Sequence, residues 1–146
     1  MQRFFNRVVW NKNKGEIIMK AEINLITIWT SNIDKMKKFY NQVLGFKIEN
    51  DLGNYVEFEN SGVRFAICMR EVMTNYSEAY GKIGVGQVFE LAFPCENSGD
   101  VDQSFKRLIE MGATAIHEPQ DMPWNQRTAL FADPDGNIHE IFAEIK

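Results

Sequence analysis

The stretch FADPDGNIHEIFAE, near the end of the chain, places a histidine directly beside a glutamate. Such a pair could bind a metal ion or move a proton. The preceding DPDGN is typical of a turn, in which Pro134 fixes φ and Gly136 tolerates a positive φ. In the strand that follows, neighbouring side chains point to opposite faces. Glu140 therefore remains a candidate site residue, and His139 is predicted to be a hydrogen-bonded residue beneath the helix layer.

The other residues capable of metal or nucleophilic chemistry are few. His117 is the only further histidine, so a histidine-rich site with four ligands cannot be built. Cys68 and Cys95 have no Cys-x-x-Cys spacing. Neither a zinc finger nor a disulfide framework is therefore expected, and a reducing cytoplasm is the predicted location.

Composition indicates an ordinary globular protein. The 146 residues are 45% hydrophobic and 25% charged, which fits one domain or two half-domains sharing a core. The net charge of −4 argues against nucleic acid as a partner. No apolar run reaches the length of a membrane span, so we expect no membrane partner either.

The first residues differ from the rest. MQRFFNRVVWNKNKGEII is basic and lacks the apolar region of a secretory signal. Two interpretations stay open: a transit peptide, or an upstream extension of a protein that starts at Met19. We exclude residues 1–20 from the fold and expect them to be poorly ordered.

The first half of the chain has an α+β pattern. Residues 23–30 are rich in β-branched side chains and are predicted to form a strand, with Leu25, Thr27 and Trp29 on one face. A helix follows, capped by Ser31 or Asn32 and ended by Gly45, with this inward stripe: Ile33, Met36, Tyr40, Val43, Leu44. Two strands at residues 55–59 and 63–69 are joined by Asn-Ser-Gly.

The second half repeats the order after about seventy residues. A strand at 87–93 precedes a helix at 98–112, whose predicted inward residues are Val101, Phe105, Leu108 and Met111. A short strand at 114–118 and a hairpin of residues 127–133 and 137–144 close the chain. The repeat predicts two β-α-β-β-β modules, 21–69 and 87–146, joined by a linker at 70–86.

These features resemble the vicinal oxygen chelate superfamily. The resemblance rests on FYNQVLGF in the first module and on PW-x-QR followed by FADPDGN-x-x-E in the second. It implies curved mixed sheets that enclose a cavity, with helices outside. The family often has glycine after the tryptophan, and this chain has Asn125, which tolerates a positive φ.

The resemblance also locates a metal site. Enzymatic members bind a divalent ion with ligands from the first and fourth strands of each module, which here are Leu25, Ala66, Glu90 and Glu140. Leu25 and Ala66 offer no lone pair. Three interpretations of the two acids stay open: a structural network with Arg64 as counter-charge, a weak metal site, or a general base whose pKa is raised by its neighbour.

A small-molecule pocket is the other expectation. Flat apolar walls with a few polar groups are typical of ligand sites. The predicted pocket residues share the cavity face or its rim: Leu25, Thr27, Trp29, Arg64, Ala66, Trp124 and Phe142.

Two functions follow from the resemblance. The first is a binding protein of the bleomycin-resistance type, without cofactor, that holds a small organic molecule. The second is a lyase or isomerase of the glyoxalase type that uses Glu140 and Glu90 with a single divalent metal ion. The resemblance further implies a homodimer.

Overall fold

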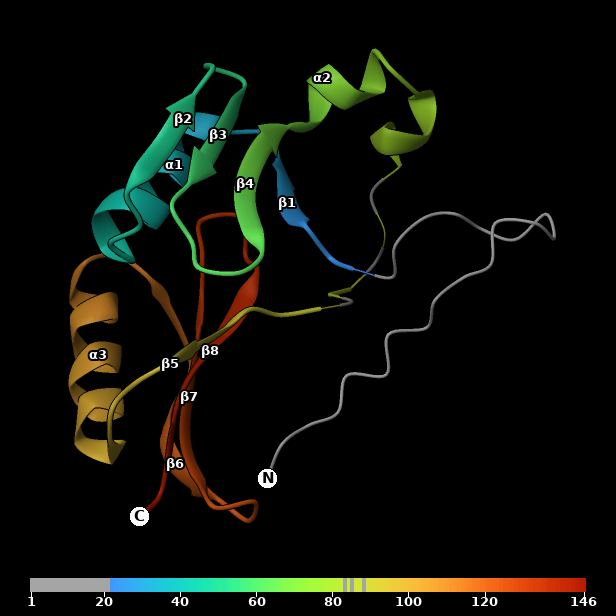
Figure 1. Cartoon of the computed structure of the whole chain (residues 1–146). Coiled ribbons are helices and arrows are strands. Elements are labelled where there is room, and N and C mark those ends of the chain that lie inside the picture. Colours follow the sequence, from blue (N-terminus) through green and yellow to red (C-terminus); the bar gives the residue numbers. More distant parts are fainter. Residues whose placement is uncertain (1–21, 83, 85, 88) are drawn as a thin grey trace, which may run out of the picture.

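The computed structural model describes residues 22–146 except 83, 85 and 88, so the predicted leader at 1–20 lies outside the described residues. Two four-stranded mixed sheets are formed, ordered β1-β4-β3-β2 and β5-β8-β7-β6 (Figure 1). Their strands are β1 (Leu25–Thr30), β2 (Ile48–Asp51), β3 (Tyr55–Phe58), β4 (Arg64–Met69), β5 (Ala92–Pro94), β6 (Thr114–Met122), β7 (Gln126–Ala132) and β8 (Ile138–Glu144).

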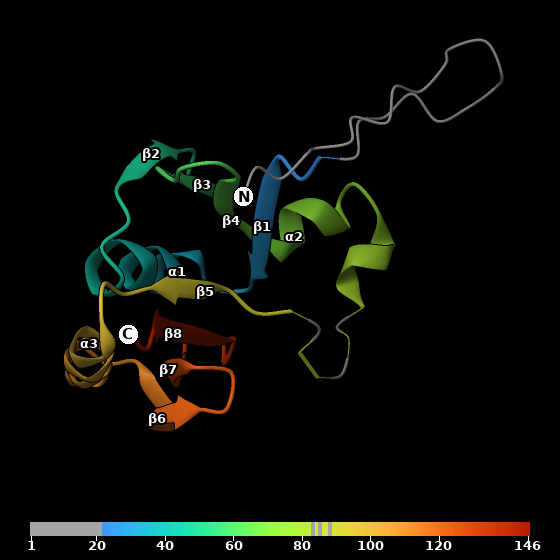
Figure 2. The same ribbon diagram turned by 60° about the horizontal axis from the view of Figure 1, so that its bottom comes forward.

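Helices connect the strands and lie outside the sheets. They are α1 (Ile33–Lys38) with its π-helical continuation η1 (Phe39–Val43), α2 (Arg70–Thr74), the 3-10 turn η2 (Glu78–Gly81) and α3 (Ser98–Glu110). Figure 2 shows β1 between α1 and α2. None of the helices in the described part of the chain has the length and hydropathy needed to cross a bilayer.

The predicted α+β class with two modules is confirmed. In each module the first strand pairs in parallel with the last, β1 with β4 and β5 with β8, and the other pairs are antiparallel. The two sheets do not close around a cavity, because the edge strands β1 and β5 belong to separate sheets.

One hydrophobic core joins the two modules. Phe39 of η1 lies 6.4 Å from Phe131 of β7, and Phe46 lies 5.9 Å from Phe93 of β5, measured between ring centroids. Buried side chains of both sheets and of helices α1 and α3 belong to this single cluster. Folding of either module thus buries apolar surface of the other.

Several element boundaries agree with the sequence. Asn32 caps α1 by accepting a hydrogen bond from the Lys35 amide, and Gly45, with a φ of 85°, follows the helix end. Asn97 caps α3 in the same way, and Gly112 has a φ of 105°. Asn125 adopts the positive φ expected of it, 66°.

Other expectations need correction. The strand predicted at 87–93 is reduced to Ala92–Pro94, while the short strand at 114–118 extends to Met122. Strand β2 was not located from the sequence, since all four of its residues are exposed and polar residues dominate it. Met111, predicted to face inward, is 39% exposed because α3 ends before it.

Candidate functional site

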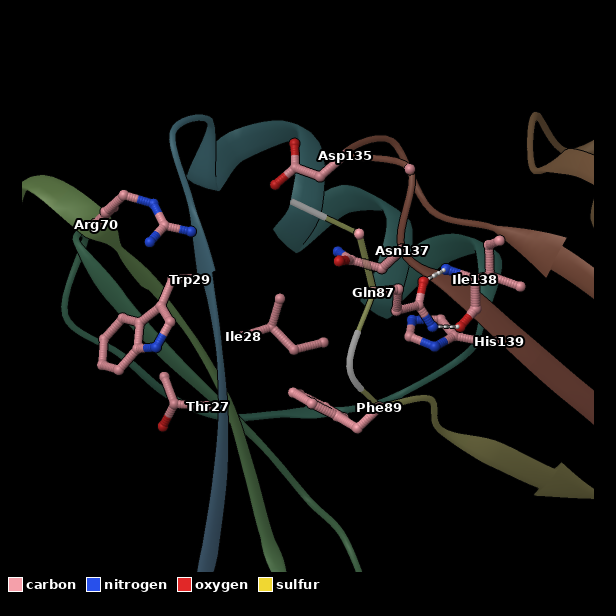
Figure 3. A pocket seen from close by; sticks show the side chains of 12 residues that line it. Thr27, Ile28, Trp29, Arg70, Gln87, Phe89, Asp135, Asn137, Ile138 and His139 are labelled. Carbon is pink, nitrogen blue, oxygen red and sulfur yellow. Dashed lines mark hydrogen bonds between the residues drawn. The ribbon is translucent and has the colours of Figure 1, made fainter. Parts of the chain in front are cut away.

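A cleft of about 520 Å³ lies between the two modules (Figure 3). We call it the inter-module cleft. The first module contributes residues of β1 and the start of α2, and the second contributes the segment before β5 and the turn before β8. Its principal lining side chains are Thr27, Ile28, Trp29, Arg70, Gln87, Phe89, Asp135, Asn137 and His139.

Strand pairing positions the first-module side of the cleft. Trp29 of β1 lies opposite Cys68 of β4 in the parallel register, so Arg70, two residues later, emerges beside Trp29. Tyr80 contacts both residues. Its ring packs edge-on against Trp29, with 5.4 Å between the ring centroids, and its backbone carbonyl oxygen accepts a hydrogen bond from Arg70 Nη1 at 3.2 Å. The predicted linker therefore supports the cleft wall.

The second-module side of the cleft is held by hydrogen bonds between side chains and backbone groups, where a longer strand would have backbone–backbone bonds. The Gln87 amide donates to the Ile138 carbonyl at 2.7 Å and accepts from the Ile138 amide at 2.6 Å. The Leu91 amide donates to His139 Nδ1 at 3.3 Å. These bonds explain why the strand predicted from residue 87 begins only at Ala92.

A buried polar network lies behind the cleft and connects the modules. The Tyr40 hydroxyl of η1 donates to Asp133 Oδ2 at 2.7 Å and lies 2.8 Å from His139 Nε2. Since Nδ1 accepts from the Leu91 amide, the hydrogen of a neutral His139 ring is assigned to Nε2, from which it is donated to Tyr40. His139 is 2% exposed, so the predicted hydrogen-bonded, buried role is confirmed. Its predicted separation from the cavity is wrong, because His139 lines the inter-module cleft and Glu140 does not.

Asp133 is the anchor of this network and of the β7–β8 turn. It also accepts hydrogen bonds from the amides of Asp135 and Asn137 and from the Asn137 side chain. Burial disfavours its charge, but the polar groups of His139, Asn137 and Tyr40 around the carboxylate prevail and hold the pKa of Asp133 below its usual value. Burial and the Asp133 charge together raise the pKa of Tyr40. No sequence pattern indicates that Tyr40 and Asp133 lie in contact, because they are 93 residues apart in the chain.

Glu140 lies on the face of β8 opposite to His139, outside the inter-module cleft. Burial and the nearby charge of Glu90 raise the pKa of Glu140 above its usual value. Glu90 is exposed, and Glu140 is half-buried. The fold therefore brings the two predicted acids together, although it separates them from Trp29 and Thr27.

The four positions implied for a metal ion do not fit one. Leu25 and Ala66 carry no donor atom, and Ala66 is fully buried. Across residues 22–146, apart from the three undescribed positions, no group of three histidine, cysteine or acidic side chains is close enough to hold an ion. Glu90 and Glu140 are thus a pair without further protein ligands, and we derive no chemical step through a metal.

Arg64 pairs within its own sheet and not with the second-module acids. Its Nη2 donates to Glu57 Oε2 at 2.7 Å and its Nε to the other carboxylate oxygen, while the Tyr55 hydroxyl also donates to Glu57 at 3.0 Å. The bonds from Arg64 lower the pKa of Glu57 despite burial. The expectation that Arg64 neutralises Glu90 or Glu140 is wrong, because sequence parity did not reveal Glu57 on the adjacent strand.

The remaining predicted residues do not line the inter-module cleft. Trp124 is 58% exposed in the β6–β7 turn, where its indole N–H donates to Gln126. Phe142 is half-buried on β8 opposite Thr128. Of the seven predicted pocket residues, Thr27 and Trp29 line this cleft. Phe89 was missed because residues 87–93 were predicted to be a strand, and Arg70 because it was assigned to the linker.

Comparison with known proteins places this geometry in a family. Residues 23–146 match the family model of the glyoxalase-like domain. The uncharacterized protein YraH of Bacillus subtilis (strain 168) is 32% identical over 124 residues, which cover 80% of this chain and 94% of that protein.

Solved structures share the fold. A glyoxalase/bleomycin resistance protein/dioxygenase family enzyme from Burkholderia phytofirmans PsJN superposes with a TM-score of 0.78 at 24% identity, over 86% of this chain and 100% of that one. A glyoxalase/bleomycin resistance protein/dioxygenase from Nocardioides gives 0.76 at 22% identity, over 89% and 87%. At these identities the likeness concerns the fold alone.

Proposed function

Since this chain belongs to the glyoxalase-like family of the vicinal oxygen chelate superfamily, we propose that it binds a small organic molecule in the inter-module cleft without a full metal site. The observation that carries the proposal is the cleft itself. Its volume of about 520 Å³ is within the range of ligand pockets, and Trp29 and Phe89 offer aromatic surface beside a few polar groups. The model for this function is a binding protein of the bleomycin-resistance type.

Fluorescence of a neutral apolar probe tests the proposal. N-phenyl-1-naphthylamine should bind the full chain and gain emission, and Phe89→Ala should weaken binding at least about fivefold, since the ring contributes apolar contact area. Phe89 is 55% exposed, so its truncation leaves the core intact. The matched control is Tyr76→Ala, an aromatic residue 84% exposed away from the cleft. Absence of probe binding, or equal affinity in Phe89→Ala, would contradict the proposal.

The alternative is a lyase or isomerase of the glyoxalase type that uses Glu140 and Glu90, with one divalent metal ion as cofactor. One observation favours part of it: a carboxylate whose pKa is raised is a better base for taking a proton next to a carbonyl group. The residues at positions 25 and 66 do not favour the ion.

Thermal unfolding with Mg²⁺, Mn²⁺, Ni²⁺, Zn²⁺ or Fe²⁺ separates the two functions. An ion that binds the native state must raise the melting temperature. For a binding protein without metal we expect no stabilisation of the wild type by any of the five. A stabilisation that disappears in Glu140→Gln would favour the metal-dependent alternative.

We also propose that the protein is a cytoplasmic homodimer. Sheet order leaves β1, β2, β5 and β6 as edge strands, which offer unpaired backbone groups to a second copy. Cys68 and Cys95 are both free thiols, as suits a reducing compartment. Sedimentation at micromolar concentration should give twice the chain mass of 16.9 kDa, and a monomer would contradict the dimer.

A further inference from the structure

Arg70 is a half-buried cation in the wall of the inter-module cleft. Its guanidinium donates one hydrogen bond, from Nη1 to the Tyr80 carbonyl oxygen. Within the described residues no carboxylate lies within 4 Å of Arg70, whereas Arg64 and Arg127 are both paired with acids. A guanidinium has five N–H donors, so most of its binding capacity is not used by these residues.

The same contacts hold Arg70 in place. Tyr80 fixes Nη1 through its backbone and contacts Trp29 through its ring. Figure 3 shows Arg70 and Trp29 on one side of β1, with the guanidinium turned toward that strand, and Ile28 and Phe89 on the other side. A cation held in this way loses little side-chain entropy when it binds an anion.

Arg70 is the charged side chain of the cleft with which a ligand can pair. Asp135 is exposed, so water screens its carboxylate. Both ring nitrogens of His139 already have partners, the Leu91 amide and the Tyr40 hydroxyl. The Asp133 carboxylate accepts hydrogen bonds from Asn137 and Tyr40. The Gln87 amide is satisfied by Ile138. Among the described lining residues, Arg70 is thus the half-buried ionic group available to a ligand.

We propose that the molecule bound in the inter-module cleft carries a carboxylate, which Arg70 binds through a charge-assisted hydrogen-bond pair while the apolar body of the ligand extends past Trp29 toward Phe89. This inference rests on the proposed function and specifies its ligand class. It runs against the acidic net charge of −4, because a half-buried cation at short range outweighs distant, solvent-screened charges.

Three probes with the same body and different charge test the inference. They are 4-phenylbutyrate, its neutral amide 4-phenylbutyramide and the cationic 4-phenylbutylamine, each titrated into the full chain by calorimetry. We expect the carboxylate to bind roughly tenfold more tightly than the amide, as a charge-assisted bond predicts, and the amine to bind most weakly. Added NaCl should weaken the binding of the carboxylate probe only.

Substitutions assign the preference to Arg70. Arg70→Gln should lower the affinity for the carboxylate to that for the amide, whereas Arg70→Lys should retain part of the preference because a lysine keeps the charge and loses the planar fork. Lys82→Gln is the matched control, since it removes one exposed positive charge from the same segment, outside the cleft. The melting temperature of each variant verifies folding.

The outcomes separate this inference from the proposed function. If the amide binds wild type as tightly as the carboxylate, or Arg70→Gln keeps the preference in a folded protein, the inference is overturned and the binding function stands. If neither these three probes nor N-phenyl-1-naphthylamine binds, both are overturned. A preference that is lost in Lys82→Gln as well would also overturn it, because the effect would then be one of net charge.

Discussion

At the scale of single residues, the buried Tyr40 hydroxyl is the link between the modules. It donates to Asp133 and lies within hydrogen-bond distance of His139, and all three side chains are at most 3% exposed. Each of the three polar side chains in this network has a hydrogen-bond partner. A buried network in which every group is satisfied tends to hold the parts that it connects in one arrangement. Because His139 and Asp133 flank the turn that lines the inter-module cleft, the network also positions that turn.

Tyr40→Phe should lower the free energy of unfolding by about 2 kcal/mol, because it removes a donor from Asp133 and an acceptor from the buried His139 ring. Urea denaturation at pH 7 measures the change. Tyr76→Phe, in which an 84% exposed hydroxyl is lost, should change stability by less than about 0.5 kcal/mol. Equal effects of the two substitutions would show that the network contributes nothing to stability.

Glu140→Gln tests the raised pKa of Glu140. A carboxyl whose pKa is higher in the folded than in the unfolded state favours folding below the unfolded value, near 4.5, and loses that contribution as pH rises through the folded value. Glu140→Gln should therefore be more stable than wild type at pH 7, and the difference should shrink toward pH 4. Denaturation curves across this pH range measure it; Glu96→Gln, at an exposed position, is the control.

At the scale of elements, turns and caps decide where strands meet. The β6–β7 turn requires the left-handed conformation at Asn125, whose side chain donates to the Ile145 carbonyl and thereby ties the turn to the end of the chain. Two observations thus assign Asn125 a conformational role: its φ of 66° and this hydrogen bond.

Asn125→Ala should destabilise the protein by about 1–2 kcal/mol. Alanine is sterically disfavoured in the left-handed conformation, and it cannot donate the hydrogen bond to the Ile145 carbonyl. Asn125→Gly should cost less, because it loses only the bond. Thermal or urea unfolding ranks the two variants. A glycine variant less stable than the alanine one would contradict the role of backbone conformation.

At the scale of the whole molecule, the shared core predicts one cooperative unfolding transition. The aromatic contacts between modules, Phe39 with Phe131 and Phe46 with Phe93, would be lost if either module opened alone. In a Trp10→Phe background, Trp124→Phe leaves Trp29 as a reporter of the first module, and Trp29→Phe leaves Trp124 as a reporter of the second. After correction for the stability of each variant by circular dichroism, both reporters should follow the global transition. A reporter midpoint that departs from it would indicate modules that unfold independently.

The sequence by itself determined what local rules govern: the α+β order, the repeat, the cap at the start of the first helix, the positive φ at Asn125, and the separation of His139 from Glu140 by strand parity. Tertiary structure decided everything that depends on distant partners. Strand pairing places Arg64 beside Glu57. Packing of the core places Tyr40 in contact with Asp133 and His139. The chain between β4 and β5 places Arg70 and Phe89 in the same cleft. Periodicity says which face a side chain occupies, but only the packing of separate elements says what it faces.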